Sequence, residues 1–151
     1  MVQPMRHCQP HDLQESKMSN LGGRRVLDLD WVESWARRVN EDRVLPVIGR
    51  FFSVRFVLGI DDTDFLCEVR RGKIERISEG LVPSDMGYEF ALRAPSAAWM
   101  KFSQKVPPPM FNDIWAMAHP LHKQLQIEGN QKPFWQNMRA LTWMLALMRE
   151  V

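Results

Sequence analysis

The segment 123–148 constrains the fold most strongly, because it combines a strand, a tight turn and a long apolar helix. Residues 124–128 alternate between polar and apolar side chains, which is the periodicity of a half-buried strand. The pair Gly129-Asn130 favours a turn, and Pro133 suits the first turn of the following helix. Residues 140–148 carry no charge, so we expect other elements to cover this helix on more than one side. The apolar part is too short to span a bilayer, which needs about 20 apolar residues.

Three antiparallel strands are predicted before this segment. Apolar and polar residues alternate over 54–58, 65–69 and 73–78, and Asp61-Asp62 and Arg71-Gly72 form short turns between them. The alternation predicts a meander with one buried face and one face largely in water.

Further elements flank the meander. A helix is predicted from Asp30, at the N-cap of a capping box, to about Asn40, and the apolar stretch 44–52 is expected to form a short irregular helix or connection. A fourth strand, with Tyr88, Phe90 and Leu92 apolar, leads into a helix that Pro95 opens. A second short helix is predicted over 110–118, with Asp113 capping, pairing or solvating it.

Composition and charge exclude several classes of protein. The 151 residues are 45% hydrophobic and 25% charged, as in ordinary globular domains. A formal net charge of +2 without a dense basic stripe argues against nucleic acid as the main partner. Two distant cysteines make no disulfide framework, and residues 1–20 contain no signal peptide, so we expect a cytoplasmic protein. We interpret residues 1–23 as a flexible N-terminal arm and 24–151 as a single domain.

The sequence predicts no catalytic residues, no metal site and no cofactor. His7, Cys8 and His11 lie close together in the arm, but a closed zinc site needs a fourth ligand that the sequence does not offer. Pro120 separates His119 from His122, so a regular helix that presents both on one face is not expected. No nucleophile lies in a glycine-flanked elbow or beside a paired histidine.

The order of these elements resembles the sterol-carrier-protein-like family of nonspecific lipid-transfer domains, in particular its bacterial stand-alone members. The resemblance covers residues 51–149. It rests on the turn Arg71-Gly72-Lys73, the fourth strand running directly into a Trp-bearing helix over 90–99, the segment Phe-Asn-Asp-Ile-Trp-Ala-Met at 111–117, and the strand end and turn at 125–130.

The resemblance implies an α+β fold with a five-stranded, mostly antiparallel sheet, helices packed on one face and a long C-terminal helix. It also implies an apolar tunnel between sheet and helices for a fatty acyl chain, acyl-CoA or a sterol-like lipid, in a non-catalytic carrier or accessory domain. The two short helices and the last helix are expected to surround this tunnel. They supply the candidate ligand-binding residues Trp99, Phe102, Met110, Phe111, Ile114, Trp115, Met138, Leu141 and Leu145.

The ten methionines and six tryptophans of the chain fit two functions. Methionine is adaptable and tryptophan is large and rigid, so together they suit either an adaptable apolar pocket or an irregular, filled core. In the first case the partner is a lipid or another hydrophobic small molecule, with transient membrane contact as an option. In the second, the domain is a structural or interaction module that forms a homodimer or docks on a partner protein. Whether Trp99, Trp115 and Trp143 line a void or fill it distinguishes the two.

Overall fold

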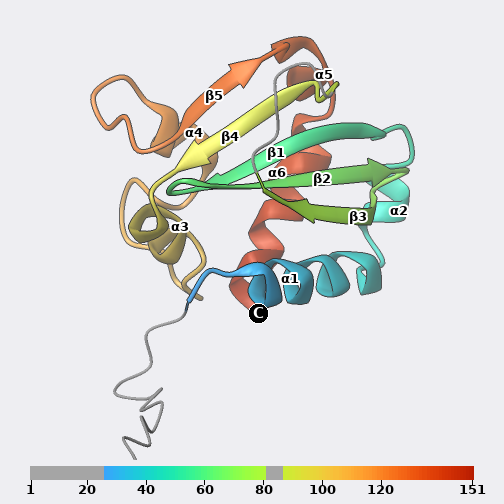
Figure 1. Cartoon of the computed structure of the whole chain (residues 1–151), viewed down its shortest axis with the longest axis horizontal. Helices are drawn as coiled ribbons and strands as arrows, with labels where there is room; N and C mark the ends of the chain where they lie inside the picture. The colour runs from blue at the N-terminus through green and yellow to red at the C-terminus, as the bar shows by residue number, and fades with distance from the viewer. Residues whose placement is uncertain (1–25, 81–86) are drawn as a thin grey trace, which may run out of the picture.

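The computed structural model describes residues 26–80 and 87–151. The predicted N-terminal arm, with His7, Cys8 and His11, lies outside the described residues. In chain order the elements are α1 (Leu29–Glu41), α2 (Leu45–Ile48), β1 (Val54–Ile60), β2 (Thr63–Arg70), β3 (Lys73–Glu79), β4 (Phe90–Ala94), α3 (Ser96–Phe102), α4 (Ile114–Ala118), β5 (Gln126–Gly129), α5 (Gln131–Gln136), α6 (Met138–Ala146) and the 3₁₀ helix η1 (Leu147–Glu150) (Figure 1).

The five strands form one sheet in the order β3-β2-β1-β4-β5. The meander is confirmed, because β1 pairs antiparallel with β2 and β2 with β3. β4 then lies on the other side of β1 and runs parallel to it, and β5 pairs antiparallel with β4. The sheet is therefore mixed, with one parallel contact at its centre, and the predicted α+β class is confirmed.

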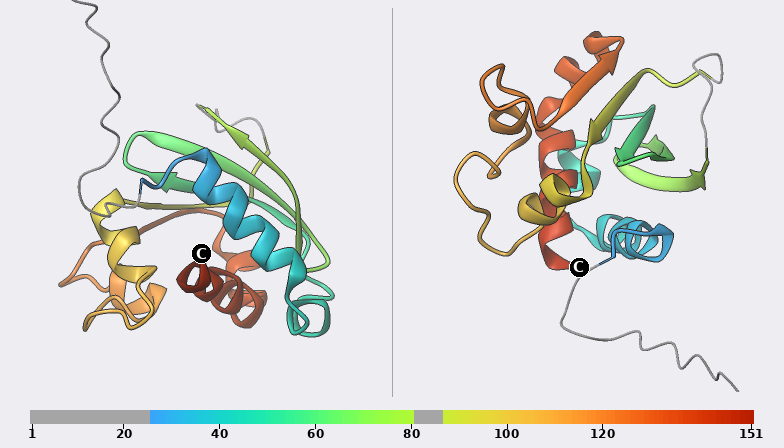
Figure 2. Two further views of the ribbon diagram at one scale, coloured as in Figure 1. Left: turned by 90° about the horizontal axis from the view of Figure 1, so that it is seen from below. Right: turned by 60° about the vertical axis from the view of Figure 1, so that its left-hand side comes forward.

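The helices cover one face of the sheet. Figure 2 shows α1 and α6 against the same side of the curved strands. Residues of β1, β2 and β4 that face this side, such as Phe56, Phe65 and Phe90, are buried in one core with α1 and α6. A buried hydrogen bond joins the two helices, since the indole Nε1 of Trp35 donates to the carbonyl oxygen of Met144 over 2.9 Å.

The opposite face of the sheet is more buried than the alternation of polar and apolar residues predicted. Val57, Leu66 and Ala91 are buried there in a small second cluster. Beside them Arg93 forms ion pairs with the buried Asp64 and, over 3.2 Å, with Glu128. The expectation of a largely wet second face is therefore wrong for the middle of the sheet, where Tyr88 packs against this cluster.

Capping residues set where several helices begin. Asp28, not Asp30, is the N-cap of α1, and its side chain accepts a hydrogen bond from the backbone of Trp31 over 3.0 Å. In α3 the cap comes from another element, because Asp61 in the β1–β2 turn accepts from the backbone N–H of Ser96 over 2.9 Å. This hydrogen bond lowers the pKa of Asp61. Two of these starts thus depend on aspartates that satisfy otherwise unpaired N–H groups.

The last helix is interrupted rather than continuous. Asn137 has a non-helical backbone and separates α5 from α6, and its side-chain amide donates to the carbonyl oxygen of Pro133 over 2.8 Å. Such local side-chain hydrogen bonds compete with the helical pattern. Asn130 at the predicted turn is the N-cap of α5. The C-terminal helix proper is therefore α6 with η1.

Replacing Trp35 by Phe should test the link between α1 and α6. The change leaves the buried carbonyl of Met144 without its donor and removes side-chain volume from the core, so we expect a loss of about 2–3 kcal/mol in the free energy of unfolding. Urea denaturation followed by circular dichroism measures it. Trp143→Phe is the matched control, because that indole is partly exposed and bonds the carboxylate of Asp42 at the surface. Its cost should stay below about 1 kcal/mol, and equal costs for both variants would contradict the assignment.

Candidate apolar ligand site

An apolar hollow lies between α4, the α4–β5 connection and β5. Its volume is about 500 Å³. The lining consists of Trp115, Ala118, His119, Pro120, Leu125, Ile127 and Gln131. Most of these side chains are apolar, and ligand pockets typically combine such walls with a few polar groups.

The walls of the hollow are fixed by short-range hydrogen bonds. Asp113 is the N-cap of α4, and its carboxylate accepts from the backbone of Ala116 over 2.8 Å, which confirms the capping role that the sequence suggested. After α4 the chain turns back, because the N–H groups of Gln124 and Leu125 both donate to the carbonyl of Met117 over 2.8 and 3.0 Å. These two hydrogen bonds to one carbonyl hold Leu125 and the start of β5 close to α4.

The predicted second helix is shorter than expected. The sequence predicted a helix over 110–118, but α4 covers only Ile114–Ala118. Met110 has a left-handed backbone, with φ of 71°, which interrupts any helix there. Residues 107–113 therefore form a connection rather than a wall made of helix.

Aromatic side chains connect the hollow to the core. Trp115 stacks on Trp135, with their ring centroids 4.6 Å apart. It also makes an edge-to-face contact with Phe134, with a centroid distance of 5.6 Å. Phe134 in turn contacts Phe90 of the central sheet at 5.4 Å. Trp115 is 38% exposed and Trp135 is 56% exposed, whereas Phe134 is buried. Trp115 thus borders the hollow while its indole stacks on the exposed Trp135 and packs against the buried Phe134.

The nine residues predicted to bind a ligand do not all reach this hollow. Trp115 lines it. Met110 is exposed and Met138 is partly buried, with its sulfur accepting from the hydroxyl of Thr142 over 3.4 Å. The other six are buried in the core: Trp99, Phe102, Phe111, Ile114, Leu141 and Leu145. Their role in ligand binding stays a prediction.

Trp99, Trp115 and Trp143, which were expected either to line a void or to fill it, lie in three different environments. Trp99 is fully buried, and its indole N–H donates to the carbonyl of Gly59 over 2.9 Å, so it packs α3 onto β1. Trp115 borders the hollow, and Trp143 lies at the surface beside Asp42.

Sequence reasoning missed Leu125 and Ile127 as lining residues. The alternation over residues 124–128 predicts that both are apolar positions of a half-buried strand, and this alternation is the only signal that the sequence offers for them. Which neighbour β5 faces depends on its pairing with β4, where Ile127 lies opposite Leu92. Ala118 and Pro120 carry no signal of their own.

The two histidines near the hollow make local contacts. The Nδ1 atom of His119 accepts from the backbone of Leu121 over 3.2 Å, and the ring of His122 packs edge-on against Phe111. Within residues 26–80 and 87–151, no group of three His, Cys, Asp or Glu side chains is arranged to hold a metal ion. Cys67 lies in the core far from solvent, and burial raises the pKa of its thiol to about 12.

Comparison with solved structures identifies the fold. The chain aligns with sterol carrier protein 2 with a TM-score of 0.65, covering 84% of this chain and 99% of that one at 13% sequence identity. It also aligns with a conserved hypothetical protein of Thermus thermophilus, with a TM-score of 0.59 over 86% of this chain and 92% of the other at 12% identity. No family model and no curated protein match the sequence. The chain therefore has the fold of sterol carrier protein 2, as the resemblance predicted.

The helices of the described residues, 26–80 and 87–151, do not include one that is long and apolar enough to cross a bilayer.

The wall that β5 provides should depend on Gly129. This residue has φ of 90°, and a Cβ atom there would lie 2.7 Å from the carbonyl oxygen of Glu89 in the neighbouring segment. We expect Gly129→Ala to lower the free energy of unfolding by about 2–4 kcal/mol, from backbone strain and the clash together. Chemical denaturation measures the loss.

Gly80→Ala is the control for Gly129→Ala. Gly80 also has a positive φ, of 135°, but among the described residues no heavy atom beyond its chain neighbours lies within 4 Å of an added Cβ. Its cost should be that of strain alone, about 1–2 kcal/mol. Equal losses would show that the close approach of β5 to β4 contributes nothing.

Proposed function

We propose that this protein binds a hydrophobic ligand, such as a fatty acyl chain, acyl-CoA or a sterol-like lipid, as a non-catalytic carrier or accessory domain. The hollow between α4 and β5, with its partly exposed Trp115, is the observation that carries the proposal. Exposed large aromatic side chains beside an apolar hollow are costly in water unless a ligand or partner covers them. The fold of sterol carrier protein 2 supports the same function.

The core residues predicted to bind the ligand extend the proposal inward. Ile114 is buried on α4 and Phe111 just before it, and Leu141 and Leu145 are buried on α6. A long acyl chain entering at Trp115 would reach them only if side chains moved. The flexible methionines Met117, Met138 and Met144 make such repacking inexpensive. We therefore propose the hollow as the entrance and the packed core behind it as the adaptable part of the site.

The alternative function, an interaction module with a filled core, draws on one observation. Six of the nine predicted residues are buried in the core rather than around the hollow. In that case the exposed Trp115 and Trp135 would form an interface with a second copy or with a partner protein. The experiment below separates the two functions.

Binding of a fluorescent fatty acid tests the proposed function. We expect saturable uptake by the purified protein, at least tenfold weaker in Ala118→Phe, where a ring fills the hollow, and in Ile127→Glu, where a charge faces an apolar wall. Native mass spectrometry of freshly purified protein should show a lipid mass that denaturation removes.

Val106→Glu is the control for these variants, because Val106 is 81% exposed and lies outside the hollow. It should take up the fatty acid like the natural protein. Lipid-free protein that fails to bind the probe, together with a dimer in sedimentation that Trp135→Glu dissociates, would favour the interaction module instead.

A further inference from the structure

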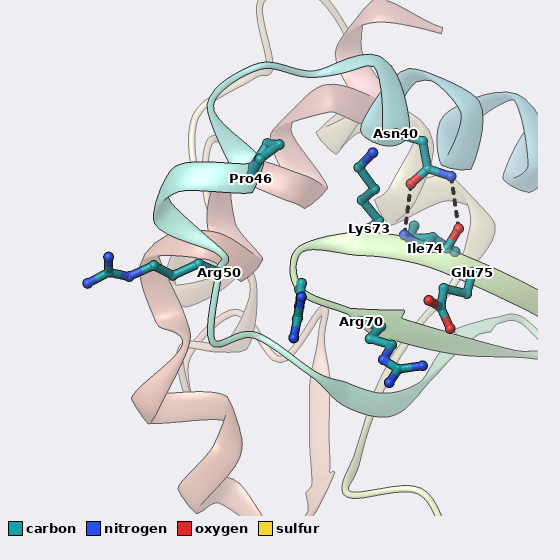
Figure 3. Close-up of a pocket in the computed structure, with 8 residues that line it drawn as sticks. Asn40, Pro46, Arg50, Arg70, Lys73, Ile74 and Glu75 are labelled. Carbon is teal, nitrogen blue, oxygen red and sulfur yellow. Dashed lines mark hydrogen bonds between the residues drawn. The ribbon is translucent and has the colours of Figure 1, made fainter.

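A second hollow lies at the other end of the molecule and is strongly basic. Its volume is about 820 Å³, and Figure 3 shows its lining between α2, the end of α1 and the β2–β3 turn. The lining consists of Asn40, Pro46, Arg50, Arg70, Arg71, Lys73, Ile74 and Glu75. Four cations thus meet a single carboxylate at this place, while the whole chain carries a net charge of only +2. The lining of this hollow therefore has a local excess of positive charge.

A close approach of Gly49, after α2, to Gly72, in the β2–β3 turn, joins the two segments that carry these cations. A Cβ on Gly49 would lie 3.0 Å from the Cα of Gly72, and one on Gly72 would lie 2.8 Å from the carbonyl oxygen of Leu45. The N–H of Gly72 also donates to the carbonyl of Phe52 over 3.0 Å, and that of Arg71 donates to the Ser53 hydroxyl over 3.0 Å. The turn after α2 and the turn between β2 and β3 are therefore locked side by side, with the cations of both on one surface.

Within residues 26–80 and 87–151, no carboxylate neutralises these four cations. None of Arg50, Arg70, Arg71 and Lys73 takes part in an ion pair with the residues that the structure describes. The one polar amide in the hollow is already engaged, because the Asn40 side chain both donates to and accepts from the backbone of Ile74, each over 2.8 Å. The charge is thus available to an external partner.

Large apolar side chains stand beside the cations. Val47 on α2 is 70% exposed, and Phe51 in the following turn is 80% exposed. The guanidinium of Arg50 lies over the Phe51 ring, 4.6 Å from its centroid. Large apolar side chains that face water do not stabilise the folded chain. The interface of a lipid bilayer accommodates them, because aromatic and aliphatic groups can lie below the level of its charged headgroups.

We infer that this surface, formed by Val47, Arg50, Phe51, Arg70, Arg71 and Lys73, docks on the anionic surface of a lipid bilayer. The cations meet anionic headgroups, and Val47 and Phe51 enter the boundary between headgroups and acyl chains. This docking goes beyond the proposed ligand binding and does not depend on it, because the two surfaces share no residue.

The directions of the side chains favour an extended anionic surface over one small anion. In Figure 3 the side chains of Arg50, Arg70 and Lys73 extend in different directions. A site for a single phosphate group would need donors that converge on one point. A bilayer presents many headgroups in a plane, and it attracts each basic side chain near its surface separately.

Vesicle co-sedimentation of the full chain tests the docking. We expect binding to phosphatidylcholine vesicles that contain phosphatidylserine, weak binding to phosphatidylcholine alone, and release by salt, since salt screens exposed charges. Single replacements of Arg70 or Arg71 by Ala should weaken binding about fivefold each. The double reversal Arg70→Glu, Arg71→Glu should weaken it at least about 25-fold, because independent losses multiply. Val47→Ser should weaken binding and leave its salt dependence in place.

Matched variants control for charge and for apolar area. Lys105→Glu with Lys123→Glu makes the same charge change in the connections on either side of α4, which lie at the opposite end of the sheet from α2 in Figure 1. Lys123 also has the positive φ of Arg71, 49° against 51°. Val106→Ser repeats the valine change at an exposed position in the same connection as Lys105. These controls should bind vesicles like the natural protein.

Several results would overturn the inference. They are equal binding to vesicles with and without phosphatidylserine, an equal loss in the control variants, or displacement from vesicles by millimolar inorganic phosphate, which would indicate a discrete anion site. Tighter binding of a single-stranded oligonucleotide than of anionic vesicles would assign the surface to nucleic acid instead. Vesicles without any probe ligand are used, so failure here leaves the fatty acid uptake experiment unaffected.

Discussion

The packing of α6 against the sheet and α1 organises the core of this protein. Leu141, Met144 and Leu145 are fully buried, and α1 lies against the same face and bonds to α6 through Trp35. Each such side chain contributes about 1.5–3 kcal/mol when it leaves water. Because residues 140–148 carry no charge, this helix has no stable position except between other elements. The sheet, α1 and the C-terminal turn are arranged around that requirement.

The same packing decides where a ligand could enter. Side chains of α3 and α6 are buried beside the sheet, and the ring centroids of Trp99 and Phe102 lie 5.8 Å apart in an edge-to-face contact. The hollow instead opens at the outer end of this core, where α4 and β5 meet and Trp115 is only partly covered. A ligand that went deeper would have to displace side chains, and the methionines there are the ones able to move at low cost. The proposed site is thus an entrance backed by an adaptable core.

The two surfaces with functional proposals belong to different parts of the fold. The apolar hollow is built by α4 and β5 beyond one edge of the sheet, and the basic surface is built by α2 and the β2–β3 turn. Neither is produced by a single motif. In each case a close backbone approach at a glycine sets the geometry, Gly129 against Glu89 for the hollow and Gly49 against Gly72 for the basic surface. A side chain at any of these glycines would force the two segments apart.

The type of nearly every element could be predicted from the sequence, because periodicity and turn residues reflect local structure. The meander, the turn at Gly129-Asn130 and the apolar C-terminal helix were all predicted, and the resemblance that their order suggested gave the correct fold. Local signals failed where local alternatives were close in energy. Asp28 rather than Asp30 caps α1, and Asn137 interrupts the last helix.

Which residues come into contact, in contrast, depends on how distant segments fold together. Three such contacts are the parallel pairing of β4 with β1, the cap that Asp61 gives to α3, and the shared lining of the hollow by Leu125, Ile127 and Trp115. Each joins segments that are distant in sequence, so no local pattern of residues predicts it. For the same reason, the sequence showed that Trp99 and Leu141 are apolar helix positions but not that they are packed in the core rather than around the hollow. The clustering of Arg50 with Arg70, Arg71 and Lys73 was equally hidden, because a net charge of +2 averages over the chain, whereas a surface potential depends on where the charges lie in space.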